Sequence, residues 1–555
     1  MTYSKWSKAT KAQNIKDVLR NIIKWKNMNK SEIDDFINFK INPHDPFLLT
    51  NMDKAVERIN NAIKNDEKIM IIGDYDCDGI CATAILYIGL MHLSANVSWQ
   101  IPDRFKDGYG VNKRIIDHAK NENSNLIITV DNGISAHDEV EYANKLGIDV
   151  IITDHHQFTH PERILPAEIT INPQIDDNYP FKGIAGCMVA FKIIKALIPD
   201  IKNNHKDLYN EFLEIVAIGT VADVMELIDE NRFYVKYGLD LLSNPKNIGL
   251  KMLMVNLKLF GRDISSTDVG FSIGPCINAA GRMGSPDDAL KLLLSDDEVE
   301  ASELSIKLIE LNEERKSIQN NVISNLDIDD NDNFIIVTLD DVGHGILGII
   351  AGQIAEKYKK PCFVLAKSGE KLSGSGRSVY SFDINNVIQN NRDIAEGGGH
   401  ALACGIKLNH DDLDEFKSRC NKHFAQWLND TPADDLMALV DVVCEIDFNL
   451  IGERLINNIN RLKPFGNGND SPIFITKDVK IDSYRIVGKN KNVVQVELSQ
   501  NGNKVKGVGF SDVLNKFNRQ IQSQYIDIAY NLEFNEWPIG TLTPQIIIRD
   551  LKAKA

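Results

Sequence analysis

The chain has little that would place it outside the cell or in a membrane. Its eight cysteines include no Cys-X-X-Cys pair, which argues against a disulfide framework and against a zinc site. No apolar run approaches the roughly 20 residues that span a bilayer. Residues 1–25 lack the continuous apolar core and the small-residue cleavage site of a signal peptide. We therefore expect a cytoplasmic protein with reduced thiols.

Positive charge is also scarce. The chain has 62 lysines and arginines against 78 aspartates and glutamates, a net charge of -16. This excess opposes nonspecific coating of nucleic acids and adhesion to anionic membranes. It still allows a nucleic-acid enzyme whose basic groups line one groove, so the charge leaves the partner undecided. The length of 555 residues predicts several domains.

Residues 67–171 alternate short β-rich segments with longer helical ones. The segments "KIMII", "NLIITV" and "DVIIT" are bounded by turn residues and are too short for helices. This alternation predicts a parallel sheet with helices on both faces. Ligand sites in such sheets lie outside the carboxyl ends of the strands.

Carboxylates and imidazoles follow three of these expected strands. They are Asp74, Asp76 and Asp78 after the first, Asp131 after the second, and Asp154, His155 and His156 after the third. One acidic turn is usually a helix cap or a solvated loop, but three strand ends of this kind in one sheet indicate a shared site. Oxygen ligands mixed with imidazole suit Mn²⁺ or Mg²⁺ better than thiol-preferring metals. Cations would turn the repulsion between the aspartates into attraction, so the pattern predicts a metal centre.

Four motifs, in order, resemble those of the DHH phosphoesterase superfamily. They are "DYDCDG", "VDNGIS", "TDHH" and "AIGTVADVM". The superfamily includes pyrophosphatases, phosphodiesterases of oligonucleotides and cyclic dinucleotides, and single-strand exonucleases. The chain departs from the smaller members at Ile72, where they carry a histidine, and Asp74 is the expected substitute ligand. The resemblance implies two Mn²⁺ or Mg²⁺ ions held by Asp74, Asp76, Asp78, Asp131, His155 and Asp223.

The resemblance also implies roles in phosphodiester hydrolysis. Asp131 is the first candidate to bridge the two metals, followed by Asp76 and Asp223, and His155 would complete a metal shell. His156 would contact the scissile phosphate or protonate the leaving oxygen, and Asp154 would orient the histidines. Asp223 alone would be an ordinary polar exit from a buried helix, so its role depends on the other three motifs.

Further segments resemble the branch of this superfamily that degrades single-stranded DNA from the 5′ end. They are "IPDRFKDGYG", "CINAAGRMG", "SGSGRS", "EGGGHALACGI" and "LKPFGNGNDSPIF". This resemblance implies a pocket for the terminal 5′ phosphate made by Arg104, Ser375 and Arg377. Arg282 would contact the strand near the entrance to the active site, and His400 would lie near the same cleft. Taken alone, a glycine-rich loop is usually a turn, and a lone arginine is as often part of a surface salt bridge.

Three domains are expected, of which the first two are α/β and the third is a β-barrel. Residues 1–330 would form a parallel-sheet DHH catalytic domain that ends in a long, charged, solvated helix, and residues 331–430 a smaller α/β DHH-associated domain. Residues 431–555 would form an OB-like β-barrel after the linker "NDTPADD".

The tail carries a clear hairpin signal. Alternating β-rich segments flank Asn501-Gly502. OB-type barrels often bind single strands, and the alternative is a β module that only packs on the core. Tyr484, Phe510 and Trp537 are expected to be core residues rather than stacking platforms.

The expected function is metal-dependent release of mononucleotides from the 5′ end of single-stranded DNA, in recombination and repair. We expect a monomer, with a single-strand-binding protein or a helicase as candidate partners. A small-substrate DHH phosphodiesterase would share the first two domains but has little use for the third. A noncatalytic replication scaffold would have lost metal ligands, whereas every acidic motif is present here.

Overall fold

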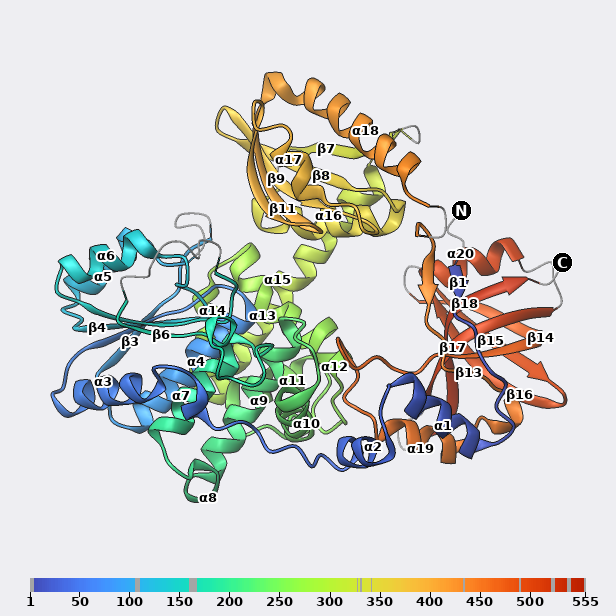
Figure 1. The fold of residues 1–555 in the computed structure, drawn as a ribbon, viewed down its shortest axis with the longest axis horizontal. Coiled ribbons are helices and arrows are strands. Elements are labelled where there is room, and N and C mark those ends of the chain that lie inside the picture. Colours follow the sequence, from blue (N-terminus) through green and yellow to red (C-terminus); the bar gives the residue numbers. More distant parts are fainter. Residues whose placement is uncertain are drawn as a thin grey trace. The chain divides into compact units, whose positions relative to one another are not determined.

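The computed structural model forms two compact units, Pro43–Pro432 and a unit built from Met1–Asn42 with Ala433–Ala555 (Figure 1). The residues described are 4–104, 110–158, 167–326, 328–329, 332–340, 342–432, 435–488, 491–520, 525–536 and 541–553. Trp537 and residues 105–109 of the "IPDRFKDGYG" segment lie outside these ranges. None of the helices in the described ranges is both long and apolar enough to cross a membrane.

A five-stranded sheet organises the first part of Pro43–Pro432. Its order is β3-β2-β4-β5-β6, and all neighbouring strands are parallel, which confirms the predicted sheet. The strands are β2 (Ile69–Ile72), β3 (Val97–Gln100), β4 (Leu126–Val130), β5 (Asp149–Thr153) and β6 (Ile169–Ile171). β2 and β4 are buried along their whole length, because their aliphatic, mostly β-branched side chains pack against both faces of the sheet.

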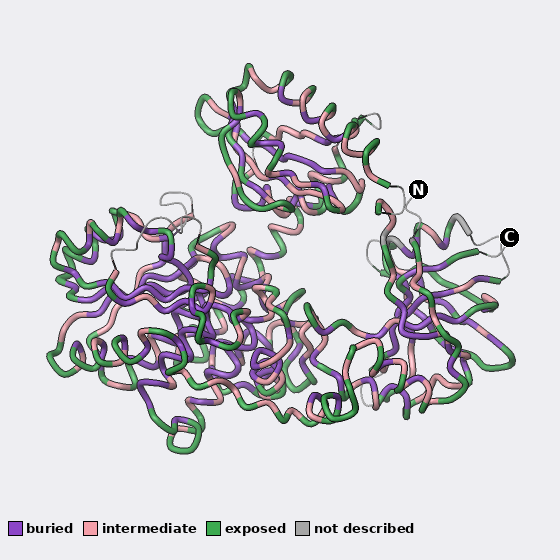
Figure 2. The backbone as a smooth tube through the Cα atoms, viewed as in Figure 1, coloured by how far each residue is buried: buried purple, intermediate pink, exposed green. Residues whose placement is uncertain are grey.

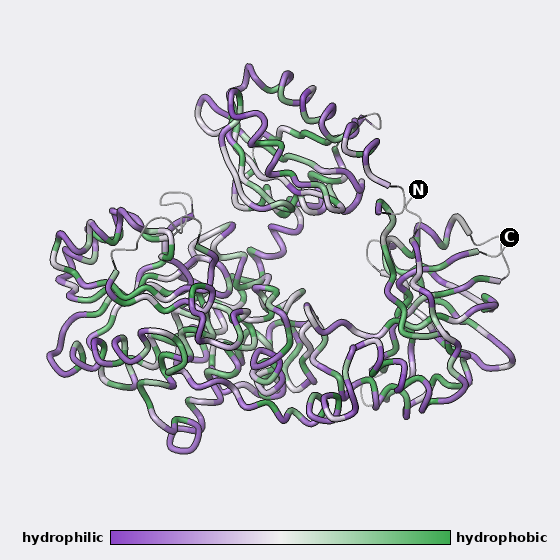
Figure 3. The backbone as a smooth tube through the Cα atoms, in the orientation of Figure 1, coloured by the Kyte–Doolittle hydropathy of each residue, from purple (hydrophilic) through white to green (hydrophobic). Residues whose placement is uncertain are grey.

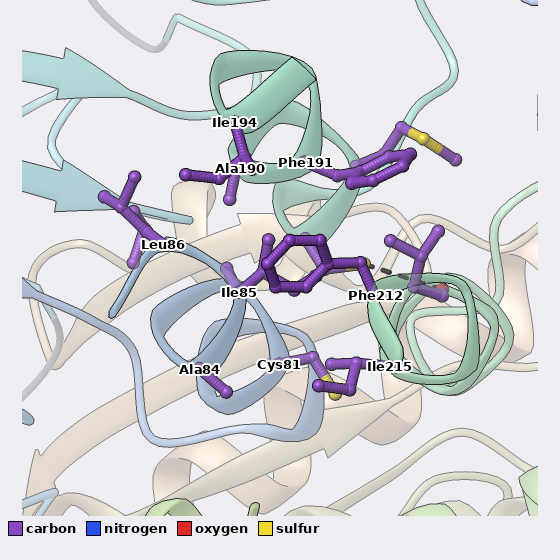
Figure 4. Close-up of a cluster of buried hydrophobic side chains, with 14 of the residues drawn as sticks. Cys81, Ala84, Ile85, Leu86, Ala190, Phe191, Ile194, Phe212 and Ile215 are labelled. Atoms are coloured by element: carbon purple, nitrogen blue, oxygen red, sulfur yellow. Dashed lines mark hydrogen bonds between the residues drawn. The ribbon is translucent and has the colours of Figure 1, made fainter. Parts of the chain in front are cut away.

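Helices cover both faces of this sheet. Ile69 and Ile71 point into a large core with α4, α7 and α9, and Met70 and Ile72 point into a second core with α5 and α6. Figure 4 shows side chains of α4, α7 and α9 meeting in the first core. These helices are α4 (Cys77–His92), α5 (Lys113–Asn121), α6 (His137–Lys145), α7 (Gly186–Leu197) and α9 (Lys206–Ala222). Of these helices, α4, α7 and α9 are mostly buried and hydrophobic, and the chain is coloured for these two properties in Figures 2 and 3.

The remaining helices of this part pack mostly on α4, α7 or α9 or on one another. They are α3 (Met52–Lys64), α8 (Ile201–Asn204), α10 (Asp229–Leu241), α11 (Ile248–Asn256), α12 (Ser266–Asp268), α13 (Gly274–Met283), α14 (Pro286–Leu294) and α15 (Glu298–Asn325). A π-helical turn, Val269–Ile273, joins α12 to α13.

A second five-stranded sheet follows α15, in the order β10-β11-β9-β8-β7. Only β7 and β8 are parallel. α16 packs on one face, and α17 and α18 pack on the other. The elements are β7 (Ile335–Leu339), α16 (His344–Tyr358), β8 (Cys362–Ser368), β9 (Lys371–Arg377), α17 (Ile384–Gln389), β10 (Ala395–His400), β11 (Ala403–Asn409) and α18 (Leu413–Asp430).

The other unit is a closed β-barrel, which confirms the expected OB-like fold. Pairing of β14 with both β15 and β17 closes the ring of β14, β15, β16, β18 and β17. The elements after residue 437 are β12 (Ala438–Val440), β13 (Cys444–Glu445), α19 (Glu453–Asn460), β14 (Phe474–Val487), β15 (Val493–Gln500), β16 (Asn503–Phe510), α20 (Ser511–Gln520), β17 (Tyr525–Asn535) and β18 (Thr543–Ala553). Asn501 and Gly502 have φ angles of 49° and 82° and join β15 to β16, so the predicted hairpin is confirmed.

Two expectations about this unit differ from the structure. Tyr484 and Phe510 are 49% and 51% exposed, so the expectation that they are core residues is wrong. Tyr484 lies opposite the buried Val496 and rests on the ring of Phe517. Tyr484 therefore lies on the side of β14 that points toward the core, but beyond the part of the strand that is packed in the interior.

Residues 1–42 pack with the barrel, although the sequence pattern grouped them with residues 43–330. β1 (Ser4–Trp6) pairs with β12, and the indole nitrogen of Trp6 donates to Asp550 at 2.6 Å. α1 (Ile15–Trp25) and α2 (Lys30–Ile37) bury Val18 and Phe36 in the barrel core. The physical reason is that an amphipathic helix needs an apolar partner, and here that partner lies some 400 residues further along the chain.

Candidate active site

The first acidic motif forms a tight turn between β2 and α4. Asp76 is the N-cap of α4, and its side chain accepts a hydrogen bond from the N–H of Gly79 at 3.0 Å. Asp74 accepts from the N–H of Tyr75 at 2.8 Å. A Cβ atom at Gly79 would lie 2.5 Å from the Cβ of Asp74, so the glycine lets the two carboxylates approach one another.

Asp131 is held in a left-handed backbone conformation, with a φ of 62°. The amide of Asn132 donates to the carbonyls of Ile72 and Val130, at 3.2 and 2.9 Å, and so ties the ends of β2 and β4 together. Strain at a non-glycine residue of this kind is characteristic of functional sites. A Cβ at Gly186 would lie 2.5 Å from the Asp131 carboxylate, so the start of α7 also fits closely around it.

The third motif is organised by Asp154. Its buried carboxylate accepts hydrogen bonds from the N–H groups of Ile134 and His155, at 2.9 and 2.7 Å. The Nδ1 atom of His156 lies 2.7 Å from the same carboxylate. Burial lowers the pKa of His156, but the hydrogen bond and charge of Asp154, followed by the charge of Asp223, raise it to about 9. Asp154 therefore orients His156 and favours its protonated form.

The four motifs meet at one edge of the sheet. The Nε2 atom of His155 lies 3.1 Å from Asp131 Oδ1, 3.6 Å from Asp223 Oδ2 and 3.9 Å from Asp78 Oδ2. Three overlapping groups have ligand atoms within 4.8 Å of one another: Asp131, His155 and His156; Asp78, His155 and Asp223; and Asp74, Asp76 and Asp131. All the residues expected to hold metal therefore lie together.

Two of these carboxylates carry an oxygen suited to a cation. Asp131 Oδ1 and Asp223 Oδ2 are buried and have no hydrogen-bond partner among the described residues, a costly state for a carboxylate. Burial and then the charges of Asp78 and Asp76 raise the pKa of Asp223 to about 8 and that of Asp131 well above its usual range. Divalent cations would stabilise the ionised forms, so the donor set fits Mn²⁺ or Mg²⁺.

Asp78 differs from the other expected ligands because both of its oxygens are already hydrogen-bonded. They accept from the N–H groups of Gly186 and Cys187, at 2.6 and 3.1 Å. These are the first amides of α7, so Asp78 fixes that helix against the acidic turn. Its part in a metal shell stays a prediction.

Two of the expected substrate-binding arginines lie beside the acidic turn. The guanidinium of Arg104 lies 5.0 Å from the ring centre of Tyr75. Arg282 donates to the carbonyl of Gly345 at 3.1 Å. Burial and the charge of Arg104 lower the pKa of Arg282 to about 10, against the opposing charge of Asp76, so the two arginines are electrostatic neighbours of the metal ligands.

The sequence did not single out two neighbours of the expected substrate-binding arginines, namely Tyr75 beside Arg104 and Arg315 near Arg282. Arg315 also lowers the pKa of Arg282, and its guanidinium donates to Asn312 at 2.9 Å and Gln319 at 3.2 Å. Asn312 and Gln319 are buried on α15 at a spacing of seven, which places them on one helix face. This spacing of polar residues is the only sequence signal for a buried polar face, and it lies in the stretch that is expected to be a solvated helix.

The other expected substrate-binding residues gather on the second sheet. Arg377 donates to Ser375 Oγ at 2.9 Å and to the carbonyl of Gly376 at 2.8 Å. Ala403 pairs with both Arg377 and His400, so the exposed His400 lies two strands from Arg377 in the same row. A Cβ at Gly348 of α16 would lie 3.0 Å from the Arg377 guanidinium, so this glycine lets α16 approach the group.

Comparison with known proteins gives a consistent result. Models of the "DHH family, N-terminal domain", the "DHHA1 domain" and the "RecJ OB domain" match residues 68–220, 331–426 and 442–550. The single-stranded-DNA-specific exonuclease RecJ of Salmonella typhimurium is 31% identical over 531 residues, which cover 91% of this chain and 90% of that protein. RecJ of Bacillus subtilis is 36% identical over 527 residues, and the chain spans only 64% of its length. A crystal structure of Thermus thermophilus RecJ with Mn²⁺ matches with a TM-score of 0.76 and 28% identity, over 91% of this chain and 72% of that one.

Proposed function

Because the chain belongs to the RecJ family of DHH phosphoesterases, we propose that it is a metal-dependent exonuclease acting in recombination and repair. It would remove mononucleotides from the 5′ end of single-stranded DNA. The observation that carries this proposal is the pair of buried carboxylate oxygens, on Asp131 and Asp223, that face His155 without a hydrogen-bond partner among the described residues. The arginines beside the acidic turn support a polyanionic substrate.

The reaction is phosphodiester hydrolysis. When bound, two Mn²⁺ or Mg²⁺ ions supply charge for the phosphate oxygens and activate a water for attack. The residues that would hold them are Asp74, Asp76, Asp78, Asp131, His155 and Asp223. His156, whose pKa Asp154 raises to about 9, favours its protonated form and would contact the scissile phosphate or protonate the leaving oxygen. Asp154 would hold the His156 ring for this role through its contact with Nδ1.

Polarity would come from the terminal phosphate. Arg104, Ser375 and Arg377 would bind the 5′ monoester, which carries more charge than an internal diester. Arg282 would contact the strand at the entrance to the active site, and His400 would extend the row beside Arg377. We further propose domain boundaries near residues 330 and 430, a cytoplasmic location and a monomer that works with a single-strand-binding protein or a helicase.

A small-substrate phosphodiesterase is the other candidate, because it would use the same metal centre. The match to a RecJ OB domain at residues 442–550 favours the exonuclease. The deciding experiment supplies purified protein and Mn²⁺ or Mg²⁺ with long single strands, long duplexes and cyclic dinucleotides. The exonuclease should release mononucleotides from single strands alone, and hydrolysis of only the cyclic dinucleotides would contradict it.

A further inference from the structure

Phe271 is the most exposed of the large hydrophobic residues in the described ranges, at 78%. It lies in the π-helical turn Val269–Ile273, which continues directly into α13. π-helical turns are rare and are frequent at functional sites. A single exposed ring is ordinary on a protein surface, so its place in the fold decides whether it can serve a ligand.

The face of α13 below Phe271 lies against the metal-binding turns. A Cβ at Gly274 would lie 3.3 Å from the Cβ of Ala222, the residue before Asp223. Asn278 accepts a hydrogen bond from the N–H of Cys77, and a Cβ at Gly281 would lie 2.5 Å from the carbonyl of Tyr75.

Gly274, Asn278 and Gly281 share one side of the helix, because spacings of four and three return to the same face. Phe271 lies three residues before Gly274, inside the π-helical turn that packs on α9. The turn that carries the ring therefore lies near Asp223, the residue that follows α9.

The two ends of α13 differ in chemistry. Arg282 stands at the C-terminal end, within the electrostatic reach of Arg104 and Arg315. Near the N-terminal end, Val224 follows Asp223 directly and is 66% exposed, with a φ of 56°. Cationic groups thus lie at one end, exposed apolar groups lie at the other, and the acidic turns lie between them.

A single strand of nucleic acid matches this order. Its phosphates suit the arginines, and its unpaired bases offer flat faces to an aromatic ring. Along the helix axis, Phe271 and Arg282 lie about 16 Å apart at 1.5 Å per residue. We therefore expect a dinucleotide bound at Arg282 to stop short of the ring and a longer strand to pass it.

We propose that Phe271 stacks on an unpaired base of the substrate strand, on the side of the metal centre away from Arg282. This inference rests on the proposed function and adds a specificity-determining residue to it. Bases inside a duplex are stacked on one another and cannot present a face to the ring, so this contact would favour single strands.

The test compares Phe271→Ala, Phe271→Trp and Val299→Ala, the last a control at another strongly exposed hydrophobic residue, 68% exposed, in the first turn of α15. Phe271→Ala should raise KM for a 20-nucleotide single strand roughly tenfold. It should leave kcat, and the hydrolysis of a 5′-phosphorylated dinucleotide, unchanged. Phe271→Trp should restore KM, and Val299→Ala should match the wild type.

A second measurement detects base stacking in the absence of hydrolysis. Strands with one 2-aminopurine at successive positions are bound in the presence of a chelator, and their fluorescence is recorded. The wild type should quench one position, and Phe271→Ala should not. An equal KM and equal quenching for the wild type and Phe271→Ala would overturn the stacking role, as would a parallel loss of dinucleotide hydrolysis. A wild type that quenches the strand but does not hydrolyse it would contradict the proposed function and leave the stacking role supported.

Discussion

The Nε2 atom of His155 lies 3.1 Å from Oδ1 of Asp131, although the two residues follow different strands of the sheet. They meet because β4 and β5 are adjacent and parallel, so their carboxyl ends lie at one edge. Both side chains are buried. This contact joins the second and third acidic motifs into one centre.

If Asp131 is a metal ligand, as proposed, Asp131→Asn should reduce cleavage by at least about a hundredfold, since loss of a direct ligand exceeds the usual effect of outer-shell changes. Binding of single strands should persist, because most such binding uses phosphate contacts elsewhere. Cleavage of a labelled strand and its fluorescence anisotropy measure the two properties. Asp177→Asn, at a fully exposed carboxylate, is the control. Near-normal cleavage by Asp131→Asn would contradict the metal assignment.

Arg377→Ala should reduce the preference for a 5′-phosphorylated strand over a 5′-hydroxyl strand by roughly tenfold, the usual worth of a charge-assisted hydrogen bond. Metal binding should be unaffected. The measurement is kcat/KM for the two substrates. Arg392→Ala is a matched control, because Arg392 is exposed on the same domain and bonds to Gln389. An unchanged preference would remove Arg377 from the terminal pocket.

Removal of the barrel should weaken binding to long single strands more than to very short ones. A simple truncation at Thr431 would leave residues 1–42 without the core that buries Val18 and Phe36. The better comparison is therefore the compact unit Pro43–Pro432, once circular dichroism and a cooperative unfolding transition show that it folds. Equal loss of affinity for both lengths would indicate that the barrel has only a packing role.

Glu214 should make the folded state less stable as the pH rises. Its side chain is buried and accepts hydrogen bonds from the N–H groups of Lys246 and Asn247. Burial raises its pKa from 4.5 to about 8, so the folded state binds its proton more tightly than the unfolded state. The stabilisation is complete below about pH 4.5 and is lost as the pH rises through about 8.

Glu214→Gln keeps an acceptor and removes the titration. Between pH 5.5 and 8.5, the wild type should lose about 3 kcal/mol more unfolding free energy than this variant. Denaturant unfolding at the two pH values measures the difference. Parallel pH profiles for the two proteins would show that Glu214 ionises normally in the folded chain.

The central sheet and most of the metal centre could be predicted from the sequence. Short β-branched runs such as 126–130 predicted strands buried on both faces, and parallel order then predicted that Asp131 and His155 would meet. Asp223 ends a helix rather than a strand, so only the resemblance to a family could add it to the centre. Local sequence patterns predict one helix or strand and its neighbours in the chain, but not contacts beyond them.

Contacts distant in sequence were harder to predict. Residues 1–42 joined the barrel because the partner of their apolar face lies hundreds of residues away. Arg315 was hidden in a charged helix whose buried face is polar. Phe271 gives no signal of its exposure, since an aromatic residue two positions from Val269 and from Ile273 is normally interpreted as core.

The most direct test of the account follows the two ends of one single strand during digestion with Mn²⁺ or Mg²⁺. The metal centre and the groups around Arg377 predict that a 5′ label leaves at once as a mononucleotide. A 3′ label should stay on progressively shorter fragments, and duplex and circular strands should remain intact. Immediate release of the 3′ label, or cutting of circular single strands, would contradict the proposed polarity.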